Sequence, residues 1–462
     1  MSTPSGTVSQ SLYAAQQKVY PREVSGRFAR LRVIAMIALL GLFYALPWAT
    51  WDGHQALLFD LPARKFYVFG LTFFPQDFFL LTVLLIIAAI SLFFFTALAG
   101  RLWCGYACPQ TVWTEIFMWM EQFAEGKRQQ RMKLDRAPWS VEKLARKAAK
   151  QAMWIPFALF TGYTFVGYFT PIRELSASVL TLSLGGWETF WILFYGFATY
   201  GNAGYMREQV CKYMCPYARF QGAMFDRNTL VIAYDTARGD PRGSRPRGID
   251  PKIRGLGDCI DCNICVQVCP TGIDIRKGLQ MDCIACAACI DACDNVMDQM
   301  KYPRGLIKYT TQNATDKKPT RVLRPRTIIY GVLLTILVSG FAVAVATRTL
   351  VELDVLRDRN ALYRTLDDGR IENVYTLRFI NKDGQAHEFK LSTTDLPKGA
   401  EVDTDVSTVR VNAGQVASLP VRVRVPAGSV AGSVKFGLSA EAIDDRDVSI
   451  TAKARFIAPA GS

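Results

Sequence analysis

The chain has 462 residues, half of them hydrophobic, and a formal net charge of +14. This composition leaves two classes, a set of soluble domains or a membrane protein with soluble parts. The positive charge does not indicate nucleic-acid binding, because the basic residues gather beside apolar segments and form no single patch.

Five apolar segments favour the membrane class. Residues 78–100 and 327–347 contain no charged residue and could cross a hydrocarbon core of about 30 Å at about 1.5 Å per residue. Residues 33–51, 153–171 and 189–205 are shorter or contain Pro and Gly, which membrane helices tolerate. We therefore expect five transmembrane helices. A buried soluble helix is the alternative for the fourth.

The positions of Lys and Arg predict the orientation of these helices. Basic residues are abundant before the first segment and between the second and the third, so those parts should be cytoplasmic. The two intervening loops contain only Arg64, Lys65 and Arg173 and should face outward. Five spans then place residues 206–326 in the cytoplasm and residues 348–462 outside, that is, in the periplasm of a bacterial inner membrane.

The motif Cys-x-Tyr-x-Cys-Pro follows both the second and the fourth apolar segments. Its repetition at equivalent points indicates a duplicated pair of membrane helices. If the helix continues this far, cysteines four residues apart share a face, and the proline ends the helix directly after them. We therefore expect four thiols to meet near the inner membrane surface: Cys104, Cys108, Cys211 and Cys215.

Three interpretations of these thiols remain open. Sulfur ligands select Cu(I), zinc or an iron-sulfur cluster, and cytosolic thiols stay reduced, so a structural disulfide is not expected. The four cysteines are a redox or copper-handling site, a set of packing residues, or the ligands of a further metal cluster.

Two cysteine runs in tandem predict the cofactor. Each has the spacing x2-x2-x3: Cys259, Cys262, Cys265 and Cys269, then Cys283, Cys286, Cys289 and Cys293. In bacterial ferredoxins with this spacing, three cysteines ligate one [4Fe-4S] cluster and the fourth ligates the other. A zinc site is the alternative, but it leaves the evenly spaced third cysteine unexplained. The runs therefore predict two [4Fe-4S] clusters.

The crossed pattern assigns Cys259, Cys262, Cys265 and Cys293 to cluster 1, and Cys283, Cys286, Cys289 and Cys269 to cluster 2. The clusters should lie close enough to exchange electrons. Asn263 and Ala287 stand where glycine usually follows the second cysteine, and Asp294 replaces a proline. Asn adopts a positive φ readily, whereas Ala287 predicts a slightly different turn at cluster 2.

Residues after the last apolar segment have the alternation of β-strands. Val421, Val423 and Val425 alternate with arginines, and turn signals recur along the segment, which predicts an antiparallel sandwich of about 110 residues and immunoglobulin-like size. The segment has no cysteine. The chain's two histidines, His54 and His387, are expected at the surface rather than as metal ligands.

The predicted fold is a multi-domain membrane protein with a five-helix α-helical transmembrane part, a ferredoxin-like α+β domain and a C-terminal immunoglobulin-like β-sandwich. The ferredoxin core should cover 257–303 with two βαβ-like halves. The expected domains are a cytoplasmic tail (1–32), a four-helix membrane domain (33–237), the cytoplasmic cluster domain with its linkers (238–326), the fifth helix (327–347) and the outer β domain (348–462).

Together, the two CxYxCP motifs, the tandem cluster runs, the fifth span and the cysteine-free β domain resemble the cytochrome c oxidase accessory proteins called CcoG, FixG or RdxA. The resemblance covers nearly the whole chain. The membrane half is also similar to the wider NapH and NosR group of membrane polyferredoxins, and the β domain narrows the resemblance to the first family.

The resemblance implies an oxidoreductase, a cupric reductase that supplies Cu(I) during assembly of cbb3-type cytochrome c oxidase. It implies copper as a further metal, and oxidase assembly factors, copper chaperones and the lipid bilayer as partners. The electron donor is not identified. One alternative is a membrane conduit that carries electrons from quinol or a cytoplasmic donor to an outer reductase, although the sequence has no evident quinone or flavin site. Another is a non-catalytic assembly scaffold.

Overall fold

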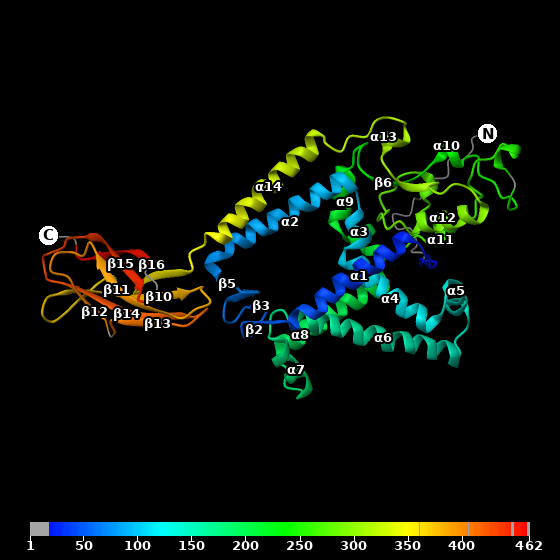
Figure 1. Cartoon of the computed structure of the whole chain (residues 1–462). Helices are drawn as coiled ribbons and strands as arrows, with labels where there is room; N and C mark the ends of the chain where they lie inside the picture. Colours follow the sequence, from blue (N-terminus) through cyan, green and yellow to red (C-terminus); the bar gives the residue numbers. More distant parts are fainter. Residues whose placement is uncertain (1–17, 249, 360, 405, 445–447, 460–462) are drawn as a thin grey trace, which may run out of the picture. The chain divides into compact units, whose positions relative to one another are not determined.

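The computed structural model describes residues 18–459 apart from residues 249, 360, 405 and 445–447. The chain divides into two compact units (Figure 1). The first contains the chain up to Ala45, Ile87–Val166 and Thr181–Thr335. The second contains Leu46–Ile86, Gly167–Leu180 and the chain from Ile336 onward. All 12 cysteines belong to the first unit.

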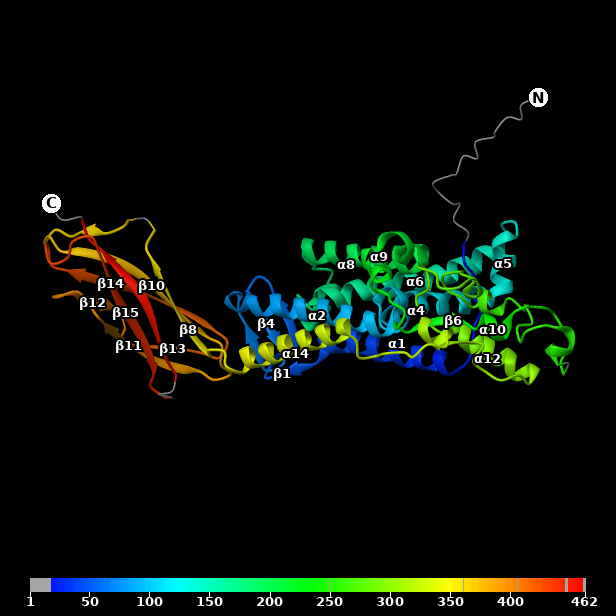
Figure 2. The same cartoon turned by 90° about the horizontal axis from the view of Figure 1, so that it is seen from above.

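Three helices in the described part of the chain are long and apolar enough to cross a membrane: α1 (Arg27–Ala45), α2 (Phe78–Ala99) and α14 (Pro325–Ala346). Helices that are apolar on all sides suit a lipid environment, so these three indicate a membrane-associated protein. Helices α2 and α14 lie side by side in both views (Figures 1 and 2), and the Phe94 ring lies against Gly331.

The prediction of five membrane helices is not confirmed. Helix α6 (Val141–Val166) has 26 residues, but its first ten include five charged side chains. Helix α8 (Gly186–Thr199) has 14 residues, which is about 21 Å at ~1.5 Å per residue. It continues as a π-helix over Tyr200–Met206. The apolar parts of both helices are therefore shorter than those of α1, α2 and α14.

Close packing joins the remaining helices of the first unit. The Trp154 indole of α6 donates to the Phe117 carbonyl of α4 (Pro109–Glu125) at 3.0 Å. A Cβ on Gly162 would lie 2.3 Å from the Ile192 carbonyl oxygen, so only glycine permits this approach of α6 to α8. Two shorter helices are α5 (Arg128–Arg136), in this unit, and α7 (Ile172–Leu180), in the second unit.

The cluster domain begins earlier and ends later than the predicted core of 257–303. Strand β6 (Val231–Tyr234) pairs antiparallel with β7 (Ile307–Thr310). Both strands contribute to a core with α12 (Ala288–Met300), although β6 precedes the predicted domain boundary at 238. The two halves are not equal, because the first has only the short helix α11 (Ile264–Gln267) where the second has α12. The small helices α10 (Thr236–Gly239) and α13 (Gln312–Thr315) flank the two strands.

The segment before α1, which the sequence assigns to a separate cytoplasmic tail over 1–32, is bound to this domain. The Arg22 N–H donates to the Gln267 carbonyl at 2.8 Å. The Asp291 carboxylate of α12 accepts from the N–H groups of Phe28 and Ala29 at 3.2 and 2.7 Å. A carboxylate at a helix N-terminus satisfies free N–H groups and interacts favourably with the helix dipole. Residues 1–17 lie outside the described residues.

The second unit contains a β-sandwich at the C-terminal end of the chain, as predicted. One sheet has the order β12-β14-β10-β8, with β9 beside β10, and the other has the order β13-β11-β15-β16. Two small sheets, β1-β2 and β3-β4-β5, precede α2. The strands of the sandwich are β8 (Val351–Arg357), β9 (Arg364–Thr365), β10 (Ile371–Asn381), β11 (His387–Thr394), β12 (Glu401–Thr404), β13 (Thr408–Val411), β14 (Val416–Val425), β15 (Ser433–Ala442) and β16 (Ser449–Ile457). The earlier strands are β1 (Thr50–Trp51), β2 (His54–Gln55), β3 (Leu57–Asp60), β4 (Lys65–Val68) and β5 (Leu71–Phe73).

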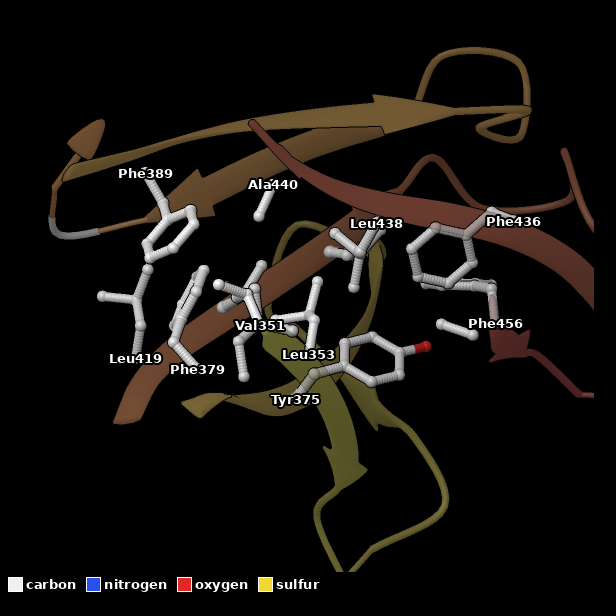
Figure 3. Packing of buried hydrophobic residues seen from close by; sticks show 14 of the residues in the cluster. Val351, Leu353, Tyr375, Phe379, Phe389, Leu419, Phe436, Leu438, Ala440 and Phe456 are labelled. Carbon is white, nitrogen blue, oxygen red and sulfur yellow. The ribbon is translucent and has the colours of Figure 1, made fainter. Parts of the chain in front are cut away.

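Aromatic side chains from both sheets fill the sandwich core (Figure 3). Phe379 of β10 stacks on Phe389 of β11, with ring centroids 5.7 Å apart. His387 is not a surface residue as predicted, because it is 3 % exposed and both ring nitrogens meet carboxylates, Asp383 at 2.9 Å and Asp444 at 2.8 Å. Burial lowers the pKa of His387, but these hydrogen bonds raise it overall.

Candidate iron-sulfur and thiol site

The two cysteine-rich loops have the same backbone conformation. Asn263 has φ 57° and ψ 12°, and Ala287 has φ 60° and ψ 12°. Asp261 and Ala285, two residues earlier in each loop, both have φ 54°. The expectation of a different turn at Ala287 is therefore wrong. Left-handed alanine is unfavourable in isolation, so the surrounding structure must impose this conformation.

The first loop encloses a cavity lined by Cys259, Cys262, Cys265 and Cys293. Cys293 comes from α12, beyond the second loop. This is the set that the spacing assigns to cluster 1. The rest of the lining is mostly apolar, with the Arg276 guanidinium among the exceptions.

The second loop also encloses a cavity. Its lining includes the four cysteines that the spacing assigns to cluster 2, together with Cys265. The cysteines of that set are Cys269, Cys283, Cys286 and Cys289.

The thiol chemistry of both cavities fits a polynuclear cluster. Among the described residues, no group of three or more His, Cys, Asp or Glu side chains is arranged to hold a single metal ion. In a cubane, each thiolate binds a different iron, so its ligands need not converge on one point. Burial raises the pKa of Cys265 to about 11 and of Cys293 to about 12. These thiols would stay protonated at neutral pH unless bound iron stabilised the thiolates.

The second cysteine of each CxYxCP motif precedes a new helix. Cys108 (φ −63°, ψ 127°) is the N-cap of α4, and Cys215 (φ −77°, ψ 109°) is the N-cap of α9 (Pro216–Met224). The extended backbone is what a residue before proline requires. A helical segment ends before each Cys-Pro step, at Tyr106 and at Met214, as predicted. Pro109 and Pro216 each then occupy the first position of a new helix.

The first cysteines lie in dissimilar turns. Cys104 belongs to the short helix α3 (Leu102–Tyr106), whereas Cys211 belongs to a π-helical turn over Val210–Met214. The structure nevertheless brings the four motif cysteines together. Cys104 interacts electrostatically with Cys108 and Cys211, and Cys211 with Cys215.

Burial sets the protonation of this thiol group. It raises the pKa of Cys104 to about 12 and of Cys211 to about 11, and the neighbouring thiols add to the effect. The Cys104 thiol donates to the Gln221 side-chain oxygen at 3.4 Å. Both thiols are therefore protonated at pH 7. A soft metal that binds them must displace their protons.

The thiol group and the second cluster loop are in direct contact. A Cβ on Gly105 would lie 2.8 Å from the Ile284 carbonyl oxygen and 2.9 Å from the Cys286 Cα. Cys104 packs against the hydrophobic cluster that contains Cys286. The glycine in the first motif thus permits a backbone approach that a larger residue would prevent.

Arg101 connects the two sites but has no evident signal in the sequence. It is 5 % exposed and donates to the carbonyls of Met281, beside the second loop, and Ala218, in α9. Burial raises the pKa of Cys104 and Cys283, and the positive charge of Arg101 opposes this effect at both thiols.

Family comparisons match three parts of the chain. Residues 206–312 match the family described as "4Fe-4S dicluster domain", and residues 80–129 match "4Fe-4S binding domain". Residues 341–459 match the immunoglobulin-like fold at the C-terminus of FixG, a family described as a putative oxidoreductase. The match over residues 80–129 includes the first CxYxCP motif. These matches indicate an iron-sulfur protein.

Several relatives are similar over most of the chain. Protein RdxB of Cereibacter sphaeroides is 42 % identical over 408 residues, which is 85 % of this chain and 85 % of RdxB. The nitrogen fixation protein FixG of Rhizobium meliloti is 37 % identical over 95 % of this chain and 92 % of its own. A crystal structure of a FixG-related protein from Vibrio parahaemolyticus is 28 % identical, covers 23 % of this chain and 95 % of its own, and has a TM-score of 0.21.

Proposed function

The chain belongs to the FixG/RdxA family, and we propose that it reduces Cu(II) to Cu(I) as a membrane-bound iron-sulfur protein. The Cu(I) would serve the copper site of a cbb3-type cytochrome c oxidase during its assembly. Oxidase assembly factors and copper chaperones are the proposed partners, and a low-potential one-electron donor would supply the electrons.

The observation that carries this proposal is the contact between the thiol group and the second cluster loop. Gly105 lies directly against the Cys286 backbone, and Cys104 packs beside it. Iron-sulfur clusters transfer single electrons, which is the change that Cu(II) requires. Thiols beside them are soft ligands that favour the cuprous product.

We assign the clusters by the cavities that collect the cysteines. Cys259, Cys262, Cys265 and Cys293 would hold cluster 1, and Cys283, Cys286, Cys289 and Cys269 would hold cluster 2. Replacing Cys259 or Cys283 alone should each remove about one cluster's iron. Iron of one or two atoms per chain with stoichiometric zinc would contradict the assignment.

We also propose the five-span orientation, with α6 and α8 supplying the third and fourth spans. The distribution of Lys and Arg supports cytoplasmic clusters and a periplasmic β domain. A reporter fused after the last residue should then be active only outside the cytoplasm. Activity only inside would overturn the orientation.

A Cu(II) reduction assay on anaerobically purified protein tests the function. The double variant Cys211→Ser/Cys215→Ser keeps side-chain volume and removes soft ligands, so its iron content should be normal while Cu(II) reduction falls at least tenfold. Full activity in this variant would show that the thiols are packing residues. A protein that transfers electrons to an outer acceptor but never to Cu(II) would be a conduit. Normal partner binding with no reduction in the parent would indicate a scaffold.

A further inference from the structure

A cavity in the first unit is lined by residues of both the thiol group and the second cluster loop. Cys211 of the thiol group and Cys286 of the second cluster loop both line it. Charged side chains from three segments also line it: Arg32 of α1, Glu115 of α4, and the neighbours Arg207 and Glu208. The cavity therefore joins the two redox sites and is unusually rich in charge.

Two carboxylates in the cavity form no salt bridge with a described residue, although the charge of Arg32 acts on Glu115. Glu208 is 9 % exposed, and its one hydrogen bond to a described residue comes from the Gln209 amide at 3.3 Å. Glu115 forms no salt bridge with any residue in the described ranges. A buried carboxylate is costly unless a cation or several hydrogen bonds compensate its charge. A cation bound beside Cys211 would compensate the buried charge of Glu208 and the half-buried charge of Glu115.

Arg207 supplies an independent observation. It is 7 % exposed, and its Nη2 donates to Glu121 at 2.8 Å while Nε donates to the Gly204 carbonyl at 2.8 Å. Its Nη1 is buried with no hydrogen-bond partner among the described residues, and the side chain lines the cavity. The backbone there has φ 41°, which is unfavourable for a non-glycine residue and is typical of functional positions.

Arg32 lines the same cavity, and its Nε is also buried without a partner in the described part of the chain. An unmade hydrogen bond from a buried charged donor is costly. The cavity therefore fits a ligand that combines a cation with acceptor oxygens. A bare metal ion would satisfy the carboxylates but not the two guanidinium groups.

We propose that this cavity binds Cu(II) before its reduction, with Glu115 and Glu208 as metal ligands and Arg207 and Arg32 as donors to an oxygen ligand carried by the metal. The identity of the metal rests on the proposed function. Carboxylates suit the harder Cu(II), whereas the adjacent Cys211 thiol suits the softer Cu(I). Binding by two carboxylates is also weak enough for the metal to leave once its preference changes.

Cu(II) binding to the full-length chain tests this site without any turnover. The protein is purified in detergent with oxidised clusters and no reductant, in a background with the four motif cysteines replaced by serine. Bound Cu(II) is followed by its EPR spectrum. The double variant Glu115→Gln/Glu208→Gln should bind at least tenfold more weakly and lose the oxygen-ligated signal. The matched control Glu142→Gln/Glu441→Gln removes two exposed carboxylates and should bind within twofold of the parent.

Iron content shows whether each variant has folded. If the double variant loses iron, Glu115→Gln and Glu208→Gln are measured singly, and each should weaken binding at least threefold. Equal affinity in the parent and in the folded carboxylate variants would overturn the site.

Two forms of the metal identify the source of the oxygen ligand. Cu(II) sulfate in a non-coordinating buffer offers bound water, and Cu(II) citrate offers a carboxylate. Arg32→Gln should weaken both forms if water is the ligand, and citrate alone if a chelator is carried in. No effect on either form would overturn the role of the guanidinium groups.

Failure of this site is distinguishable from failure of the proposed function. A thiol-intact chain that binds Cu(II) through Glu115 and Glu208 but does not reduce it would refute the proposed function alone. A chain that reduces Cu(II) with unchanged KM after both carboxylates are replaced would refute this site alone.

Discussion

The two CxYxCP segments share a sequence pattern and an extended second cysteine but differ in what they contact. In the first, Gly105 lies against the second cluster loop. In the second, Tyr213 is 68 % exposed and Met214 is 55 % exposed. A duplicated motif can thus keep its reactive groups while its surroundings diverge. We infer that the first copy packs more tightly against the second cluster loop than the second copy does.

The largest expected difference between the two copies comes from replacing the residue that follows the first cysteine of each motif. In Gly105→Val, the new side chain would overlap the backbone of the cluster loop, which cannot yield easily, so the cost should reach or exceed the ~1–3 kcal/mol of ordinary overpacking. We expect loss of about half the iron. Lys212→Val removes only an ion pair to Asp282 at 3.7 Å, worth about 1 kcal/mol or less. Equal iron loss in the two variants would contradict the assigned difference.

Removing one thiol pair at a time sharpens the comparison. Cys104→Ser/Cys108→Ser and Cys211→Ser/Cys215→Ser should each keep the iron of the dicluster domain, because none of these residues lines either cluster cavity. Each should lower Cu(II) reduction at least tenfold, since electrons and metal meet at the combined group. Anaerobic Cu(I) counting is the measurement. A normal rate in one of the two would confine the function to the other copy.

Thiol alkylation tests the protonation of the two copies. Burial raises the pKa of Cys104 to about 12 and of Cys211 to about 11, so Cys211 has about ten times more thiolate at any pH well below 11. Both rates should rise with pH from 7 to 9.5, as measured by iodoacetamide labelling and mass spectrometry. Arg101→Gln removes a positive charge that lowers both pKa values, so it should slow both reactions. A rate that is already constant by pH 8 would contradict the raised pKa.

The smallest effect should come from the motif tyrosines. The hydroxyl of Tyr106 lies 3.4 Å from that of Tyr309, and Tyr106→Phe should lower the free energy of unfolding by about 0.5–1.5 kcal/mol. Tyr213→Phe should change it by less than about 0.5 kcal/mol because the side chain is largely exposed. Thermal unfolding of the detergent-solubilised chain measures both. The reverse order would show that the second copy is the better packed.

Features set by short-range spacing could be predicted from the sequence. The two cysteine sets that the spacing groups together each line one cavity, and Cys265 lines both. The assignment of each set to a cluster stays a prediction from the spacing. The alternation around Val423 correctly predicted the sandwich, since one face of each strand is buried.

Features set by tertiary contacts could not be predicted. Ala287 adopts a left-handed conformation that alanine disfavours, and its loop has the same backbone conformation as the loop of Asn263. The π-helical turn around Cys211 corresponds to no periodic pattern in the sequence. Arg101 contacts residues distant in the sequence, and Glu208 lines a cavity with such residues, so their positions could not be predicted. His387 is buried and contacts two carboxylates that no sequence pattern connects to it.

The most direct test is the stoichiometry of a single reaction. Protein reduced with dithionite and freed of excess reductant is mixed anaerobically with Cu(II), and cluster oxidation and Cu(I) are counted together. The account predicts one Cu(I) for each electron lost from the clusters, and neither change in Cys211→Ser/Cys215→Ser. Cluster oxidation without Cu(I), or full Cu(I) formation in that variant, would contradict it.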